Sequence, residues 1–226
     1  YSGMMRSTVV ISNPEGITGI EPYEGVNFSQ RVLSQSFDRV ELEITSVREL
    51  ATSATFPVDR DALPPEALEA LIPRPQWIQS DDPTIVATAQ AITASARLQA
   101  EAVDAIIAWV RGHVVYDYLG PRDALAVYES GSAYCVGFAN LAMALLRAVN
   151  IPARAQYGTV GAWDGWGSPV EGGRHVWVEV FYPDVGWVGC DPQVSANMLD
   201  TAHIVGFLDQ SGKPGTIVQR VAHEGS

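Results

Sequence analysis

Three side chains that can together transfer an acyl group lie in the C-terminal half of the chain. Cys135 begins the stretch CVGFANLAMALLRAVN, His175 opens HVWVEVF, and Asp191 stands directly before Pro192. A thiol nucleophile needs a base, and the base needs a third group that orients it. Cys, His and Asp in this order can supply these roles. Each also has a commoner structural interpretation: a buried small side chain, a solvated or core imidazole, and a turn residue.

The stretch that follows Cys135 is almost wholly apolar. Between Val136 and Val149 the only strongly polar side chains are Asn140 and Arg147. This pattern predicts a helix that is buried nearly all round, with Cys135 in its first turn. The unpaired N–H groups and the dipole at a helix start favour an anion, here the reactive thiolate. A backbone N–H at the same point can also hold a developing oxyanion.

His175 lies on a predicted strand, where side chains alternate between two faces. His175, Trp177 and Glu179 share one face, and the valines between them share the other. The next predicted strand ends in GWVGCDP and carries Asp191. A hairpin loop with an odd number of residues puts Asp191 opposite Trp177, one diagonal step from His175. An even loop moves Asp191 to the valine face, so the triad requires an odd loop or a bulge.

The elements that must position these residues follow from periodicity. Apolar residues at helical spacing predict helices over 84–96 and 98–114, the first begun by Asp82 as cap and Pro83 as first helical residue. Alternation predicts strands over 40–47, 153–160, 174–182 and 186–191. The proline-bearing segment 57–83 is typical of a wrapped connector that contains one short helix. Helices followed by antiparallel strands predict an α+β fold.

Two long stretches resemble the core of the transglutaminase-like superfamily, in particular its bacterial members. They are YCVGFANLAMALLRAVNIPARAQYG and RHVWVEVFYPDVGWVGCDPQ, and the helices SDDPTIVATAQAIT and AIIAWVRGHVVYDY upstream resemble it too. The resemblance covers Pro64 to Gln193. It implies a papain-like fold in which the nucleophile begins a buried helix packed on an antiparallel sheet. It also implies that Cys135 is the nucleophile, His175 the base and Asp191 the orienting acid.

Two positions depart from the family pattern, and the resemblance suggests a domain division. Ala133 and Gly137 stand where many relatives carry a glycine and an acidic or histidine residue. Because neither position belongs to the triad, we expect the departures to affect substrate preference. We divide the chain into an N-terminal strand and loop extension, residues 1–63, and a transglutaminase-like catalytic domain, residues 64–226.

The resemblance implies acyl transfer on peptide or side-chain amides, with a peptide or protein as substrate. If water resolves the thioester, the enzyme is a cysteine protease or amidase, which we take as the first hypothesis. If an amine resolves it, the enzyme is a transglutaminase that crosslinks protein glutamine. A third alternative is a non-catalytic peptide-binding module on the same fold.

Aromatic residues near the expected cleft are candidates for substrate contacts. Trp163 and Trp166 lie in the long loop 161–174 that leads to His175, and Tyr134 precedes the cysteine. We predict that these three bind substrate. Trp109, Tyr116 and Tyr134 are candidates for a second oxyanion donor, with plain packing as the alternative for each.

Composition excludes several classes of partner. A net charge of −12 repels nucleic acid and anionic membrane surfaces, and no apolar run reaches the roughly 18 residues of a membrane span. The two cysteines form no disulfide framework, although one bridge between Cys135 and Cys190 is an alternative. Cys190, His113 and His203 show no paired metal-ligand spacing with Cys135, so we expect neither a metal nor another cofactor. The residues indicate neither a compartment nor an oligomeric state.

Overall fold

The computed structural model describes residues 3–161, 170–206 and 216–222. The chain forms two compact units, each assembled from separate segments. The first unit contains residues 1–50, 156–176 and 198–226, and the second contains residues 51–155 and 177–197. The compact units do not show where the catalytic domain begins, so the division at residue 63 stays a prediction.

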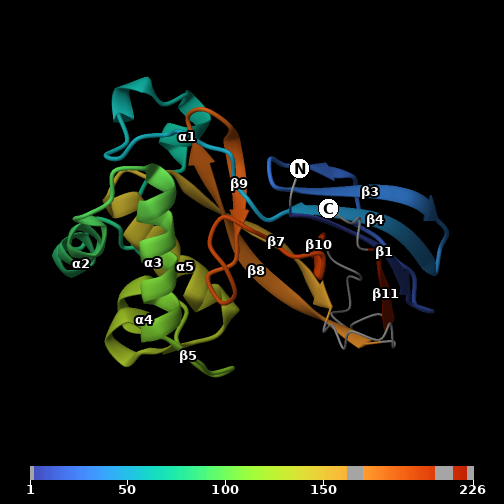
Figure 1. Cartoon of the computed structure of the whole chain (residues 1–226). Coiled ribbons are helices and arrows are strands. Elements are labelled where there is room, and N and C mark those ends of the chain that lie inside the picture. The colour runs from blue at the N-terminus through green and yellow to red at the C-terminus, as the bar shows by residue number, and fades with distance from the viewer. Residues whose placement is uncertain (1–2, 162–169, 207–215, 223–226) are drawn as a thin grey trace. The chain divides into compact units, whose positions relative to one another are not determined.

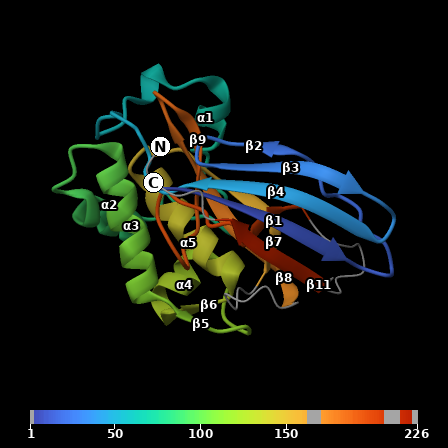
Figure 2. The same cartoon turned by 45° about the vertical axis from the view of Figure 1, so that its right-hand side comes forward.

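The first unit is built on an antiparallel sheet whose order differs from the chain order. The strands of this sheet are β1 (Met4–Ser12), β2 (Tyr23–Glu24), β3 (Phe28–Gln35), β4 (Arg39–Val47), β7 (Ala153–Gly161), β8 (Val170–Tyr182), β10 (His203–Val205) and β11 (Thr216–Ala222), and the first residues of β7 and the last residues of β8 belong to the second unit. They follow the order β10-β7-β8-β11-β1-β4-β3-β2. Strands β1, β3 and β4 lie side by side (Figures 1 and 2). The N-terminal strand β1 therefore lies between β4 and the late strand β11.

Strands β1 and β4 show the alternation expected of half-buried strands. Val9 and Ile11 on β1 and Val40, Leu42 and Ile44 on β4 are all buried, and the residues between them are partly exposed. The prediction of a strand over 40–47 is confirmed by β4.

The second unit is mainly helical. Its elements are the 3-10 turn η1 (Arg60–Ala62), α1 (Pro65–Glu69), α2 (Pro83–Thr93), α3 (Gln99–His113), β5 (Val115–Tyr116), α4 (Ala124–Ser130), β6 (Ser132–Ala133), α5 (Cys135–Ala148) and β9 (Gly186–Cys190). Helix α5 packs against α2, α3 and α4, and Figure 1 shows α3 lying along it. Twelve consecutive or near-consecutive residues of α5 are buried, as the apolar sequence predicts.

The helix starts follow the predicted capping chemistry. The Asp82 side chain accepts hydrogen bonds from the backbone N–H groups of Thr84 and Ile85, and Pro83 is the first residue of α2. At α3 the Glu101 carboxylate accepts from the N–H groups of Arg97 and Leu98. These hydrogen bonds lower the pKa of Glu101. Helix α3 begins at Gln99, one residue after the predicted start.

Arg147 fixes the C-terminal end of α5. Its guanidinium donates to the carbonyl of Ala153 through Nε and Nη2 and to that of Ile72 through Nη1. Burial, with the charge of Arg74 as a smaller cause, lowers the pKa of Arg147 to about 10. The one strongly polar residue near this helix end thus ties α5 to the proline-bearing connector and to the start of β7.

None of the helices in the described part of the chain combines the length and the apolar character that a membrane span needs. The structure carries the mixture of helices and antiparallel strands that the sequence predicts.

Candidate active site

Cys135 is the first residue of α5 and is 3% exposed. The short strand β6 runs into it and pairs in parallel with β5, which puts Tyr116 beside Ala133. The turn that follows β5 packs tightly on the same segment, since a Cβ on Gly137 would lie 2.6 Å from the Pro121 carbonyl oxygen. Asn140 also donates to the carbonyl of Arg122. The start of α5 is therefore held from two sides.

A group of tyrosines surrounds the thiol. The Tyr134 ring lies 6.1 Å from that of Tyr116 and 5.2 Å, edge-on, from that of Tyr118. Burial, a hydrogen bond with the Cys135 thiol and the neighbouring ionisable groups raise the pKa of Tyr134 to about 12. Burial and the nearby Cys135 also raise the pKa of Tyr116. The Tyr134 phenol therefore keeps its proton at neutral pH and contacts the sulfur as a hydrogen-bond donor.

The hairpin between β8 and β9 has the parity that the triad requires. Tyr182 pairs with Gly186, which leaves a loop of three residues, and Val178 pairs with Cys190. If the register is continued by one residue beyond the Val178–Cys190 pair, Asp191 falls opposite Trp177, on the face of His175. Glu179 lies on that face too, but it is 1% exposed and its Oε2 lies 2.8 Å from Arg154 Nε.

Asp191 is a buried carboxylate in a closed turn. It is 1% exposed, and its Oδ1 accepts from the N–H of Gln193 at 2.9 Å. Its backbone N–H donates to the carbonyl of Ser195, and its own carbonyl accepts from Val194 and Ser195. A carboxylate out of water is costly unless polar groups meet it, so this position is consistent with a specific role.

Asn197 holds the far end of this turn. Its backbone N–H donates to Cys190 Sγ at 3.1 Å, and its Oδ1 accepts from the Tyr182 hydroxyl at 2.5 Å. Its Nδ2 donates to Asp104 Oδ1 at 2.9 Å. The turn that carries Asp191 is therefore tied to β8, β9 and α3 by one residue, through its backbone N–H and its side-chain amide.

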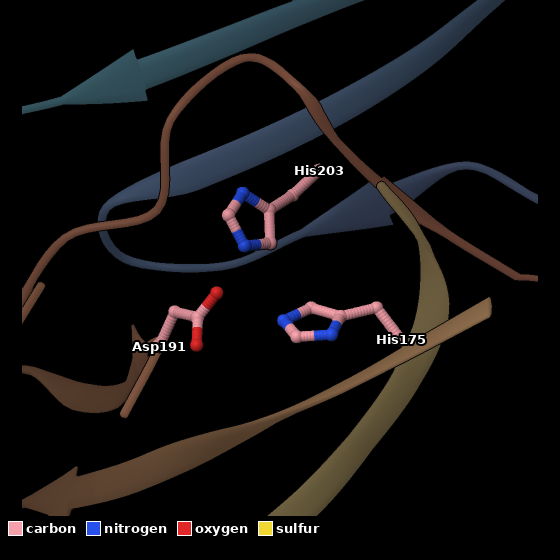
Figure 3. A group of neighbouring side chains, drawn as sticks. All are labelled: His175, Asp191 and His203. Atoms are coloured by element: carbon pink, nitrogen blue, oxygen red, sulfur yellow. The ribbon is translucent and has the colours of Figure 1, made fainter. Parts of the chain in front are cut away.

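His175 lies on β8, a strand that continues unbroken into the hairpin with β9. His175 and Asp191 occur with a third residue, His203, in a group in which one ligand atom from each lies within 4.8 Å of the others. Figure 3 shows these three side chains gathered together. The His175 and His203 rings lie 6.0 Å apart, and His203 Nδ1 lies 2.8 Å from Asp200 Oδ1. Two imidazoles and a carboxylate can in general also hold a metal ion.

The second cysteine has a different environment. Cys190 is fully buried, and both cysteines are free thiols. Burial, opposed by the hydrogen bond from the Asn197 N–H, raises the pKa of Cys190 to about 12. The alternative of a Cys135–Cys190 bridge is therefore not realised in this structure.

The transglutaminase-like superfamily matches residues 86–192. This range contains Cys135, His175 and Asp191. The matched residues make up slightly less than half of the chain and are similar to a transglutaminase-like core.

Solved structures share the fold of this core and its surroundings. A candidate cysteine protease from Cytophaga hutchinsonii superposes with a TM-score of 0.51 at 17% identity, over 99% of this chain and 90% of that chain. The periplasmic domain of TgpA from Pseudomonas aeruginosa gives 0.50 at 15% identity, over 85% of this chain and 88% of that chain. No curated protein sequence matches the chain. At these identities the similarity shows the transglutaminase-like, papain-like fold.

The other residues predicted from the sequence are the candidates for substrate contacts and for a second oxyanion donor. Trp163 and Trp166 lie outside the described residues, so their substrate contacts stay a prediction. Tyr134 contacts the thiol, as described above. Trp109 stacks on His113 at 4.3 Å and on Tyr128 at 5.8 Å. This stacking gives Trp109 a packing role, which is the alternative to an oxyanion donor.

Close packing explains why glycine stands at position 137, where many transglutaminase-like relatives carry another residue. Its missing side chain lets the Pro121 carbonyl and the Ala133 methyl approach α5 closely. A larger residue could not occupy this place unless the turn moved.

Sequence reasoning missed Asn197 and the place of His203. Asn197 shows no pattern that predicts its contacts, since its partners come from three separate segments of the chain. The sequence presents His203 only as a conceivable metal ligand beside Cys135, and no periodicity connects it to His175.

Proposed function

We propose that this chain is a thiol-dependent acyl-transfer enzyme that acts on peptide or side-chain amides as a cysteine protease or amidase. The observation that carries the proposal is the position of Cys135 as the first residue of the buried helix α5 in a transglutaminase-like core. A structural cysteine would need neither the helix start nor a phenol donor at its sulfur.

In the proposed reaction, the Cys135 thiolate attacks the amide carbonyl and forms a C–S bond. The C–N bond then breaks as His175 gives a proton to the leaving amine, and a thioester remains. Water, deprotonated by His175, releases the acid and regenerates the thiol. Backbone N–H groups in the first turn of α5 hold the oxyanion, a contribution of about 2.7–4 kcal/mol per donor in other enzymes.

The hairpin register supports the roles of His175 and Asp191. It puts Asp191 on the same face as His175, and Asp191 is a buried carboxylate. Such a carboxylate can orient an imidazole and stabilise its protonated form during turnover. Glu179 is not a competing orienter because Arg154 engages it.

Alkylation of the thiols tests whether Cys135 is activated. At pH 6, iodoacetamide should label one thiol per folded chain of the wild type, and peptide mapping should place the label on Cys135. Cys190 should react only after denaturation, because it is fully buried and its pKa is raised to about 12. His175→Ala should slow labelling of Cys135 at pH 6 by at least about tenfold. Equal rates in the wild type and His175→Ala would count against the proposed pair.

The acyl acceptor is tested with peptides that carry glutamine and lysine. Wild type and Cys135→Ala are incubated with them, and cleavage, ammonia release and crosslinked products are measured by mass spectrometry. We expect cleavage or ammonia release from the wild type and none from the variant. Crosslinked product in place of hydrolysis would refute the protease and amidase assignment and favour the crosslinking enzyme. A wild type inactive in all three assays would leave a binding module.

A further inference from the structure

A cavity of about 530 Å³ opens in the second unit, between the end of α3 and the start of α5. Arg111 and Gly112 of α3, Tyr116 of β5, Phe138 of α5 and Gln193 line it. Its size lies within the usual range of small-molecule and side-chain sites.

The cavity adjoins the proposed nucleophile through shared residues. Tyr116 lines the cavity and interacts electrostatically with Cys135. Phe138 follows Cys135 by three positions on α5, so both lie on one side of the helix. Gln193 belongs to the turn of Asp191 and donates its N–H to the Asp191 carboxylate. A group bound in the cavity would therefore lie next to the reacting amide.

The charge of the cavity is positive although the chain is strongly acidic. Among the described residues that line the cavity, Arg111 alone is charged. It is exposed, and within the described residues its guanidinium has no ion-pair partner. The carbonyl end of α3 opposes an anion with about half an elementary charge, whereas Arg111 attracts it with a full charge and a planar fork of donors.

Gln193 adds an unmet acceptor. Its Oε1 is buried and has no hydrogen-bond partner within the described residues. A buried acceptor without a donor is unfavourable, so a ligand with an N–H group would satisfy it. The cavity thus offers a cation for a carboxylate and, once the Gln193 side-chain amide turns towards the ligand, an acceptor for an N–H. An acidic residue within a peptide carries both of these groups.

We propose that this cavity is a specificity subsite for an acidic residue that neighbours the attacked amide in the substrate peptide. The inference rests on the proposed function and adds the class of substrate to it. Arg111 binds the side-chain carboxylate, Gln193 accepts the peptide N–H, and Tyr116 and Phe138 contact the aliphatic part.

Gly112 provides a way to close the subsite without disturbing the fold. A Cβ at this position would meet no heavy atom within 4 Å. Gly112→Leu should therefore fill the cavity, and Gly112→Ala is its matched control because it adds a single methyl group in a helix.

The test measures binding to the Cys135→Ala protein, so that no turnover is needed. The probes are acetylated and amidated pentapeptides with a central glutamine, preceded or followed by Glu, Gln or Lys. Isothermal titration calorimetry should show that Glu binds about tenfold tighter than Gln at one of these two positions. Arg111→Gln should abolish the preference, and Arg39→Gln, which changes an exposed arginine of the first unit, should retain it. Gly112→Leu should weaken the Glu peptide, whereas Gly112→Ala should not.

Gln193→Met separates the two contacts. It should weaken the Glu and Gln peptides by similar factors and leave the ratio between them unchanged. Equal binding of the three peptides, or a Glu preference that persists in Arg111→Gln, overturns the proposal. A Glu preference with a wild-type Cys135 that is not activated supports the subsite and refutes the enzyme. An activated Cys135 without any preference refutes the subsite alone.

Discussion

The two thiols of this chain differ because of their neighbours. Cys135 begins a helix and contacts a phenol, whereas Cys190 lies in a strand pair, fully buried, with a pKa raised to about 12. An amide N–H at the sulfur does not offset the cost of taking a thiolate out of water at Cys190. The reactivity proposed for Cys135 must therefore arise from the groups around it rather than from the residue type.

Tyr134→Phe tests one of these groups. Because the pKa of Tyr134 is raised to about 12, its O–H stays a donor at every pH below roughly 11. A donor stabilises the thiolate more than the thiol, so its removal should slow alkylation of Cys135 several-fold, by about 3–10 times. The measurement is the iodoacetamide rate between pH 5 and 10.

Tyr118→Phe is the matched control for this change. Tyr118 lies edge-on to Tyr134. Tyr118→Phe also removes a phenol hydroxyl, but it leaves the Tyr134 donor at the sulfur in place. Its alkylation rate should equal that of the wild type. An equal loss of rate in both variants would assign the effect to general polarity rather than to the Tyr134 hydrogen bond.

At the scale of elements, the start of α5 depends on close packing against the turn after β5. Gly137→Ala would force a Cβ to within 2.6 Å of the Pro121 carbonyl oxygen. We expect this variant to lower the free energy of unfolding by about 1–3 kcal/mol and to slow alkylation, because the helix start must shift. Gly112→Ala, in open space on α3, should be neutral or raise stability by about 0.5–1 kcal/mol. Urea denaturation of both proteins compares them, and similar losses in the two would contradict the packing argument.

The turn after β9 depends on Asn197. Asn197→Ala removes the acceptor of the buried Tyr182 hydroxyl and puts alanine at a φ of 53°, in the left-handed region. Both effects are unfavourable, and we expect a loss of about 2–4 kcal/mol in the free energy of unfolding. Differential scanning calorimetry at pH 7 measures it, and an unchanged melting temperature would exclude a role of this residue in holding the turn.

Asn197→Asp should give a stability that depends on pH. Burial already raises the pKa of Asp104, and the Asn197 amide that opposes this shift would be replaced by a second carboxylate. Two carboxylates in contact bind a proton more tightly in the folded than in the unfolded protein. The variant should therefore be least stable above the raised pKa and regain stability as the pH falls towards 4. Unfolding midpoints at pH 4, 5.5 and 7 would reveal this, and a constant difference from the wild type would refute it.

Sequence patterns predicted the helices and strands well, because such elements depend on the chemistry of neighbouring residues. The Asp82 cap and the buried helix after Cys135 follow from neighbours in the chain, whereas the sequence left the parity of the hairpin open and the structure supplies it. The strand expected to begin at residue 174 instead begins at Val170, since pairing with β11 extends it. Asn197, Gln193 and Arg111 could not be found in this way, because their surroundings combine segments that lie far apart in the sequence.

At the scale of the whole molecule, the strands that pair with the N-terminal strand β1 could not be predicted from the sequence. Strand β1 pairs along nearly its full length with β11 as well as with β4, and β11 pairs with β8 at Val170 and Glu171. Such long-range pairing leaves no periodic signal, since alternation indicates a strand but not its partner. Strand β8, which carries His175, is thus connected through β11 to the first strand of the chain.

Loss of β1 should therefore affect the strand of the proposed base more than the helix of the nucleophile. Deletion of residues 1–12 leaves β4 without one neighbour and β11 with only its two-residue pairing to β8. We expect faster amide exchange in β8 near His175 and a loss of activity, while α5 keeps its slow exchange. Deletion of residues 1–3, which precede β1, should change neither.

A milder pair of variants tests the same connection in a protein that still folds. Ile11 is fully buried and its neighbour Val10 is partly exposed on the other face of β1. Ile11→Ala should lower the free energy of unfolding by about 2–5 kcal/mol, and Val10→Ala by much less. If the connection through β11 holds, Ile11→Ala should also speed exchange in β8, because opening of the first unit becomes more frequent. Exchange in β8 that stays at the wild-type rate in Ile11→Ala, despite the lowered stability, would show that the strand of His175 is held independently of the N-terminus.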